Sequence, residues 1–208
     1  NKDVYIKTFG GPNKSSLTGL VKQFDDANKY ATASVDTNVS YASGAFRESN
    51  LNYNLEGGIT IEMWLKKPKF EPAKTQKEVL FDLWNGVAPG NSNYGRFRLE
   101  LTGASSGSPF LLTAYSGTTG FQNQLIGTNL ATGSIADWTH VAVTTKNSGS
   151  NVAINLYING ALNQTKSISS VNLKQVTGSL ISYIGALQTA PSGTSALAGA
   201  GKFSGSID

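Results

Sequence analysis

Side chains able to do acid–base or nucleophilic chemistry are few in this sequence. It has a single histidine, His140, and no cysteine, which excludes a thiolate nucleophile, a cysteine-based zinc site and a metal centre built from several histidines. His140 lies inside the alternating stretch 138–142, where a lone histidine is typical of a structural role. Cleavage of a glycosidic bond needs two carboxyl groups that flank the bond. Glu62, Asp82 and Glu100 are candidates for such a pair only if their strands are neighbours.

A second group of side chains suits the binding of a sugar rather than its cleavage. Aromatic faces pack against the C–H groups of a sugar, and planar polar side chains bond its hydroxyl groups. Side chains of both kinds fall on polar positions of alternating stretches: Trp64, Asp82, Trp84, Arg98 and Glu100. They form one ligand-binding patch if the strands that carry them lie side by side. The alternative is structural, with both tryptophans packed under loops and with Arg98 and Glu100 in cross-strand ion pairs.

Turn-rich stretches offer another binding surface, because binding residues concentrate on loops held by a rigid scaffold. The ranges 88–91 and 105–109 are rich in Gly, Pro, Ser and Asn. Aromatic and amide side chains of the predicted loop surface are Asn91, Asn93, Tyr94, Tyr115, Phe121, Gln122 and Asn123. Tyr94 and Tyr115 therefore join the predicted ligand-binding residues. Ordinary turn chemistry is the alternative explanation for these positions.

The elements that must position these residues are β-strands. Apolar and polar residues alternate with a period of two, which is typical of half-buried strands, over the ranges 59–66, 79–84, 96–101, 140–144 and 154–158. A helical period appears only weakly, between Gly19 and Tyr30, and predicts a short turn of helix at most. Many short strands separated by such turns predict two packed antiparallel sheets.

The clearest local signal is the Asn-Gly pair at 159–160. Both central residues of a type I′ turn need positive φ, which asparagine and glycine tolerate best. The turn therefore predicts a hairpin in which Ile158 pairs with Ala161 and Tyr157 pairs with Leu162.

Length and composition indicate one sizeable β domain. The chain has 208 residues, of which 39% are hydrophobic and 14% charged, and 17 Lys+Arg against 13 Asp+Glu give a net charge of +4. These cations are too few and too scattered for a nucleic-acid binder. The segment Lys66–Lys77 holds five lysines but also two prolines, so we expect a solvated connection between strands. No apolar stretch is long enough to predict a membrane-spanning segment.

Four short blocks, taken in order, carry a resemblance to a known family. They are 58–66 (GITIEMWLK), 137–144 (DWTHVAVT), 156–160 (LYING) with 184–185 further on, and 203–208 (FSGSID). In their order and spacing the sequence resembles the laminin-G-like branch of the concanavalin A-like lectin/glucanase superfamily. The resemblance covers residues 45–208.

The resemblance implies an all-β fold, an antiparallel two-sheet jelly-roll sandwich of the concanavalin A-like type. It implies a domain over 45–208, with residues 1–44 as an N-terminal segment that supplies first strands or a docking arm. In similar sequences another strand follows the block 203–208, so either a continuation supplies this last strand or the fold closes differently. Glucanases of the superfamily carry a Glu-x-Asp-x-x-Glu motif, and no glutamate here is followed two residues later by an aspartate.

Many laminin-G-like modules bind calcium at the edge of the sandwich, so the resemblance makes calcium a candidate cofactor. Ca²⁺ takes about six to eight oxygen ligands. The available oxygen clusters are Asp25 and Asp26 with Asn28, and separately Asp36 and Asp208. None forms an Asp-x-Asp-x-Asp-Gly loop, and Asx-type turns explain them without a metal. We therefore predict no required cofactor and keep Asp25, Asp26 and Asp208 as candidate ligands.

Together these features predict a non-catalytic binding module that recognises glycans or neighbouring proteins in adhesion or attachment, at an extracellular or virion surface. The cysteine-free composition, rich in Gly, Ser, Thr and Asn, resembles that of many tailed-bacteriophage structural proteins. One alternative is therefore a virion structural or decoration protein held by protein contacts, without a sugar site. The other alternative is a divergent glycoside hydrolase. No nucleic-acid or membrane partner is expected, and a homo-oligomer within a larger assembly is compatible with either binding role.

Overall fold

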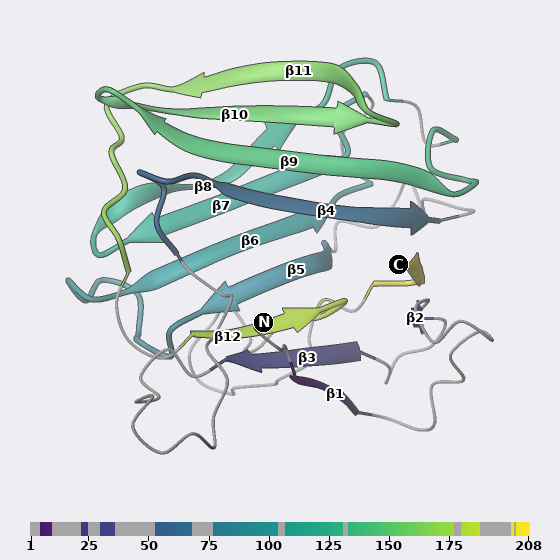
Figure 1. Cartoon of the computed structure of the whole chain (residues 1–208), viewed down its shortest axis with the longest axis horizontal. Coiled ribbons are helices and arrows are strands. Elements are labelled where there is room, and N and C mark those ends of the chain that lie inside the picture. The colour runs from purple at the N-terminus through teal and green to yellow at the C-terminus, as the bar shows by residue number, and fades with distance from the viewer. Residues whose placement is uncertain are drawn as a thin grey trace.

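The chain is built from β-strands, as a computed structural model shows (Figure 1). The structure describes the backbone of three N-terminal strands, at 5–9, 22–24 and 30–35, and residues 53–67, 77–103, 107–130, 133–176, 180–187, 201 and 203–208. Within these ranges there are thirteen strands and no helix. The predicted all-β class is confirmed.

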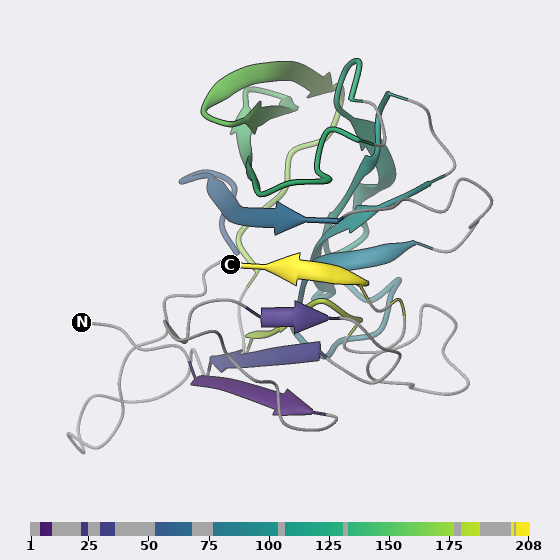
Figure 2. The same cartoon turned by 90° about the vertical axis from the view of Figure 1, so that its right-hand side faces the viewer.

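The strands form two antiparallel sheets that face each other as two layers (Figures 1 and 2). Sheet A has seven strands, in the spatial order β1 (Tyr5–Phe9), β3 (Tyr30–Val35), β12 (Leu180–Ile184), β5 (Glu78–Trp84), β6 (Gly95–Leu101), β7 (Phe110–Ser116) and β8 (Thr119–Ile126). Sheet B has six, in the order β11 (Ala161–Ile168), β10 (Asn151–Ile158), β9 (Thr139–Ser148), β4 (Ile59–Lys66), β13 (Gly205–Ile207) and β2 (Lys22–Phe24). The two-sheet sandwich expected from the alternation is confirmed.

The core lies between the sheets because each strand turns alternate side chains inward. In β4, Ile61, Met63 and Leu65 are at most 8% exposed, whereas the residues between them point to solvent. Phe97 and Leu99 of β6 are fully buried on the opposite layer. All five stretches predicted from alternation lie within strands, namely β4, β5, β6, β9 and β10.

The hairpin predicted at 159–160 is also confirmed. Asn159 and Gly160 have φ of 50° and 78°, as a type I′ turn requires. Ile158 pairs with Ala161, and Tyr157 pairs with Leu162. The turn therefore sets the register of these two pairs, and beyond them a bulge shifts the register, so that Leu156 lies opposite Gln164.

Strand β5 departs from simple alternation because it contains a bulge. Its register with β6 shifts between Val79 and Phe81, so that Val79 lies opposite Glu100 whereas Phe81 lies opposite Leu99. Residues directly opposite each other share a face, and Val79 therefore faces away from the core that Phe81 packs against. The prediction that these two residues share a face is wrong, because a bulge adds a residue that periodicity does not reveal.

The weak helical period between Gly19 and Tyr30 is a wrong prediction for 22–24 and for Tyr30, whereas residues 19–21 and 25–29 lie outside the described residues. Lys22–Phe24 is strand β2, which pairs with β13, and Tyr30 begins β3. Sheet pairing decides the conformation of such a short, weakly patterned segment. In Figure 2, β13 lies between β4 and β2, so N-terminal and C-terminal strands are neighbours in sheet B.

A buried lysine ties the two sheets together at the end of β4. Lys67 is 3% exposed, and its ammonium group donates to both carboxylate oxygens of Glu78 at 3.0 and 2.8 Å and to the Ser204 carbonyl at 2.9 Å. It also lies 5.5 Å from the centre of the Phe203 ring. The prediction of a solvated segment is therefore wrong for Lys67; residues 68–76 lie outside the described residues.

Candidate functional site

A groove of about 450 Å³ lies on the face of sheet A that points away from the core. Its walls come from β6, β7 and β8, from the loop 85–94 and from the β7–β8 turn. The lining residues are Pro89, Gly90, Tyr94, Arg96, Arg98, Thr113, Tyr115, Gly117, Thr118 and Gln122. Aromatic rings, guanidinium groups and a side-chain amide thus surround one hollow.

Strand register brings these side chains together. Arg96 lies opposite Tyr115, and Arg98 lies opposite Thr113, across the β6–β7 pair. The intervening residues Phe97 and Leu99 are fully buried in the core. Because successive side chains of a strand alternate between faces, the apolar residues hold the strand while the polar ones line the groove.

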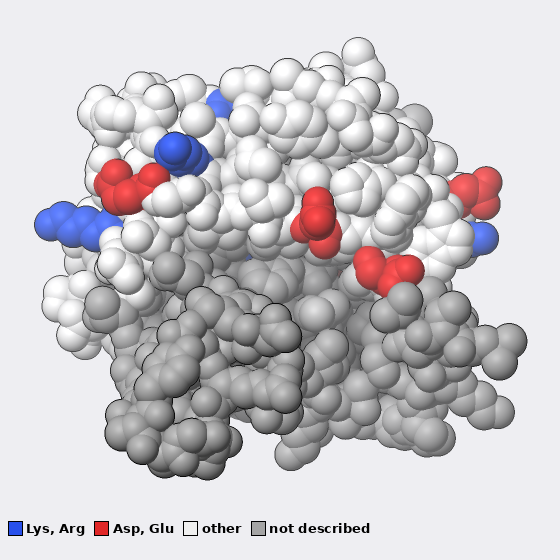
Figure 3. Space-filling view, viewed as in Figure 1, with Lys and Arg blue, Asp and Glu red and all other residues white. Residues whose placement is uncertain are grey.

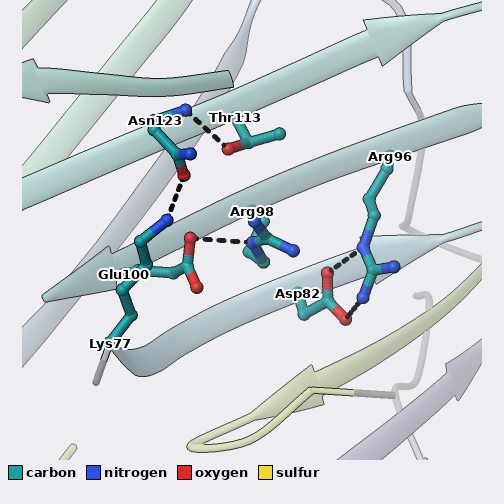
Figure 4. A network of polar contacts seen from close by, with 7 residues as sticks. All are labelled: Lys77, Asp82, Arg96, Arg98, Glu100, Thr113 and Asn123. Atoms are coloured by element: carbon teal, nitrogen blue, oxygen red, sulfur yellow. Dashed lines mark hydrogen bonds and ion pairs between the residues drawn. The ribbon is translucent and has the colours of Figure 1, made fainter. Parts of the chain in front are cut away.

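One arginine of the groove is held by a buried carboxylate. Asp82 is fully buried, and its two carboxylate oxygens accept hydrogen bonds from Nε and Nη2 of Arg96 at 2.8 and 2.7 Å (Figure 4). Burial alone would lower the pKa of Arg96, but the adjacent Asp82 carboxylate outweighs it and the pKa is raised. The guanidinium group also lies 5.4 Å from the Trp84 ring centre. Arg96 is therefore a fixed cation.

The second arginine is held less completely. Arg98 Nε lies 2.8 Å from Oε2 of Glu100, and the two side chains are 11% and 3% exposed. These two atoms are not aligned as a hydrogen bond, and neither has another hydrogen-bond partner. Both residues belong to strand β6, as Figure 4 shows. Their side chains can meet because residues two apart on a strand point to the same face. The predicted cross-strand pairing is therefore wrong for Arg98 and Glu100, whereas Asp82 and Arg96 do pair across strands.

Two tyrosines stand beside the arginines. The rings of Tyr94 and Tyr115 have centres 5.8 Å apart and are inclined by 43°. Burial raises the pKa of Tyr94, although the positive charges of Arg96 and Arg98 partly oppose this. The Tyr94 hydroxyl is therefore a neutral hydrogen-bonding group at ordinary pH.

The loop that carries Tyr94 is ordered by its own hydrogen bonds. The Asn85 side chain accepts from the backbone N of Val87 and of Gly95 at 3.3 and 3.0 Å and donates to the Asn93 carbonyl at 2.6 Å. Trp84 Nε1 donates to the Val87 carbonyl at 2.7 Å. These bonds hold the wall of the groove in place without a ligand.

A bulge in β8 aims Gln122 into the groove. The β7–β8 register shifts between Leu112 and Ala114, so that two residues of β8, Gln122 and Asn123, lie opposite Thr113. Asn123 has a positive φ of 54°, and its backbone N donates to Oγ1 of Thr113 at 3.1 Å. Lys77 donates to the Asn123 side chain, as Figure 4 shows. Bulges often re-aim a side chain next to a functional site.

The seven predicted ligand-binding residues divide into three groups. Tyr94, Arg98 and Tyr115 line the groove. Asp82 and Glu100 are buried beside the lining residues, and Trp84 bonds to the loop that it packs under. Trp64 lies on β4 of sheet B. The hypothesis of one shared patch therefore fails for Trp64, because its strand belongs to the other sheet.

Trp64 instead contributes to the outer surface of sheet B. It is 46% exposed, and its ring centre lies 5.3 Å from that of His140. Nε2 of His140 is 3.9 Å from the Glu62 carboxylate. The structure thus separates Glu62 from Asp82 and Glu100, which lie in sheet A.

The predictions missed Arg96 and Thr113 as lining residues. Arg96 is two residues before Arg98, so the period of two already places both on one face. Gln122 was expected on the loop surface, but it lies on β8, and Tyr115 lies on β7. Phe121, expected on the same surface, is 8% exposed and part of the core.

The metal candidates receive no further support from the described residues. No three His, Asp or Glu side chains gather as ligands within those ranges. Asp25 and Asp26 lie outside the described residues. Asp208 is exposed, and its backbone pairs with that of Trp64 through two hydrogen bonds of 2.8 and 3.0 Å.

Sequence comparison decides the family. Residues 25–208 match the concanavalin A-like lectin/glucanases superfamily, in its laminin G group. The chain belongs to this superfamily. Among curated protein sequences, none matches the chain. Among the residues that the structure describes, no helix is long and apolar enough to cross a membrane.

Similar solved structures include binding proteins and enzymes. A heptameric SAP-like pentraxin from Limulus polyphemus has a TM-score of 0.48 and 16% identity over 76% of this chain and 64% of its own. The carbohydrate recognition domain of Emp46p has a TM-score of 0.43 and 11% identity over 98% and 84%. A GlcNAcα1-4Gal-releasing endo-β-galactosidase from Clostridium perfringens has a TM-score of 0.39 and 9% identity over 98% and 61%. The chain thus spans less than two thirds of the pentraxin's length.

Proposed function

We propose that the protein is a non-catalytic saccharide-binding module and that the groove of sheet A is its binding site. The observation that carries this proposal is the joint lining of one groove by two tyrosine rings, two arginines and a glutamine amide. Sugar sites combine aromatic faces with a few oriented polar groups.

The groove is preorganised, which favours binding by a small polar ligand. Tyr94 packs against Tyr115, the loop 85–94 is closed by the Asn85 side chain, and Arg96 is fixed by Asp82. Ordering these groups in advance lowers the entropy lost on binding. The 450 Å³ volume accommodates a ligand of a few sugar rings.

The absence of catalysis is part of the proposal and is supported by the lining. No carboxylate is among the described residues that line the groove. A glycosidase needs an acid and a base or nucleophile that both reach the scissile bond. Asp82 and Glu100, the carboxylates of this face, are 0% and 3% exposed, and Asp82 is occupied by Arg96. We therefore propose binding without turnover.

A glycan array followed by calorimetry of the full chain tests this function. Tyr115→Ala removes a ring of the groove, and Trp64→Ala removes an exposed ring of the other sheet as a matched control. For a saccharide found on the array, Tyr115→Ala should weaken binding by about fivefold or more, since a stacked ring contributes about 1 kcal/mol or more. Trp64→Ala should leave the affinity unchanged.

Three results would contradict the proposal. The first is an array without any bound saccharide, and the second is loss of affinity in Trp64→Ala but not in Tyr115→Ala. The third is release of reducing ends from a bound oligosaccharide, which would demonstrate hydrolysis. Thermal unfolding of both variants shows whether each remains folded.

The surface of sheet B favours a second candidate, attachment to a neighbouring protein at an extracellular or virion surface. In Figure 3, which looks onto β4 and β9–β11, charged side chains are sparse on the described surface. Trp64, Trp138 and Leu162 are 46%, 39% and 57% exposed. Uncharged surface with exposed aromatic residues is typical of protein contacts. In this candidate function, Trp64→Ala rather than Tyr115→Ala would abolish co-purification with the partner protein.

A further inference from the structure

We propose that the groove recognises a saccharide that bears a carboxylate, as uronic and sialic acids do, and that the terminal nitrogens of Arg98 bind this carboxylate. The inference rests on the proposed function, because it names the ligand class of the same site. It starts from a difference between two neighbouring arginines, of which only Arg96 already forms a bidentate pair with a carboxylate.

Arg96 is already bound in the way that an arginine binds a free carboxylate. Two of its nitrogens donate to the two oxygens of Asp82, which is the bidentate arrangement of a strong pair. Arg98 contacts Glu100 through Nε alone, without hydrogen-bond alignment. Among the described residues, no acceptor bonds its two terminal nitrogens. Arg98 nevertheless lines the groove and is 9% exposed.

Nε of Arg98 is buried without a hydrogen-bond partner, whereas the two terminal nitrogens are not among the buried unpartnered atoms and remain open to the groove. A ligand that brings two acceptor oxygens into the groove can therefore bond these terminal nitrogens in place of water. The planar fork of arginine matches a planar carboxylate, with two parallel N–H···O bonds. The structure already shows this match at Asp82 and Arg96, which lie on the same face of the sheet.

The charges of this face also favour an anion. Arg96 and Arg98 line the groove, whereas their partners Asp82 and Glu100 do not. In both ion pairs the arginine, rather than the carboxylate, therefore faces the ligand. Tyr94 stays neutral beside them, so no lining residue within the described ranges repels an anion. The adjacent rings of Tyr94 and Tyr115 supply the surface for the sugar that carries the carboxylate.

Calorimetry of the full chain with paired ligands tests the inference. Oligosaccharides of galacturonate, glucuronate and mannuronate are each compared with their methyl esters, and sialyllactose is compared with lactose. A charged hydrogen-bonded contact predicts that an acid binds about tenfold or more tightly than its ester. Equal affinity of acids and esters would overturn the inference while leaving saccharide binding intact. Binding of no saccharide at all would instead remove the proposed function itself.

Variants test whether Arg98 causes the preference for the acid over its methyl ester. Arg98→Gln alone leaves Glu100 buried without its cation, so Arg98→Gln/Glu100→Gln removes both charges together. We expect the double variant to remain folded and to bind acid and ester with equal affinity. Lys146→Gln, which removes one exposed cation from sheet B, is the matched control and should keep the preference. Retention of the preference by the double variant, or equally tight binding of a sulfated galactan oligosaccharide, would overturn the assignment of a carboxylate to Arg98.

Discussion

At the scale of single residues, Tyr53 is a buried polar group next to the strand of Arg96 and Arg98 that is held by specific partners. Tyr53 is fully buried, its ring lies edge-on to Phe97 at 6.0 Å, and its hydroxyl donates to the Arg96 carbonyl at 3.2 Å. Burial raises the pKa of Tyr53, as it does that of Tyr94. Both phenols are therefore kept protonated by the fold.

These raised pKa values predict a loss of stability in alkali. The native state holds the two phenolic protons more tightly than the unfolded chain, whose tyrosines titrate at their ordinary pKa of 10.0. The stabilisation is complete below pH 10 and is lost as the pH rises above it, at a slope of up to about 1.4 kcal/mol per pH unit for each tyrosine. Urea unfolding between about pH 9 and 11.5 measures the slope.

Tyr53→Phe tests whether Tyr53 causes part of the loss of stability in alkali. It removes one titrating phenol and one hydrogen bond, so we expect a loss of about 1 kcal/mol at neutral pH and a shallower decline above pH 10. Parallel pH profiles for the wild-type protein and Tyr53→Phe would show that Tyr53 does not cause the alkaline instability.

At the scale of elements, the β7–β8 hairpin positions one wall of the groove. Tyr115 lies opposite Gly120, and a Cβ atom at Gly120 would lie 2.3 Å from the Ala114 carbonyl oxygen and 2.5 Å from Cδ1 of Tyr115. Only glycine lets the strand pass this close to the ring. The position of the proposed binding residue Tyr115 therefore depends on glycine at position 120.

Gly120→Ala should consequently displace Tyr115 and reduce both stability and binding. Overpacking of this kind costs about 1–3 kcal/mol in free energy of unfolding, which denaturant titration measures. The matched control is Gly133→Ala, whose added Cβ would meet no atom within 4 Å; its expected effect is within about 0.5 kcal/mol. If both alanine variants unfolded at the same denaturant concentration, the close approach would not be a constraint.

At the scale of the whole molecule, the Lys67 ion pair joins the two layers next to the C-terminal strand. Lys67 follows β4 of sheet B, Glu78 begins β5 of sheet A, and Ser204 precedes β13. Ser204 N also donates to Glu78 at 3.0 Å. The side chains of Lys67 and Glu78 are 4% and 13% exposed, so neither charge is well compensated by water if its partner is removed.

Lys67→Met should therefore destabilise the fold strongly, by about 3–5 kcal/mol, because it leaves Glu78 as a largely buried charge without its cation. Lys67→Met/Glu78→Met removes both charges and should recover most of that loss. Lys66→Met is the control, since Lys66 makes only an exposed contact of 3.6 Å with Asp137, worth about 0–1 kcal/mol. An equal loss in the double and single variants would show that the charge pair is not the cause.

The strands and the hairpin could be predicted from the sequence because both follow from local physics. Alternation in 59–66 indicates which side chains of the strand face the core and which face solvent. The Asn159-Gly160 pair indicates a turn with two positive φ values. Both signals arise between residues close in the chain. The bulges at Val79–Phe81 and opposite Thr113 were missed because one extra residue changes the register without changing the composition.

The candidate site was only partly predictable for a related reason. Alternation by itself placed Trp64, Asp82 and Arg98 on polar faces, and the family blocks indicated a sandwich. Which strands are neighbours was decided by tertiary pairing, which put Trp64 on sheet B and brought Arg98 beside Tyr115 and Gln122 on sheet A. Strand order depends on contacts between residues distant in the chain, and no local pattern encodes it.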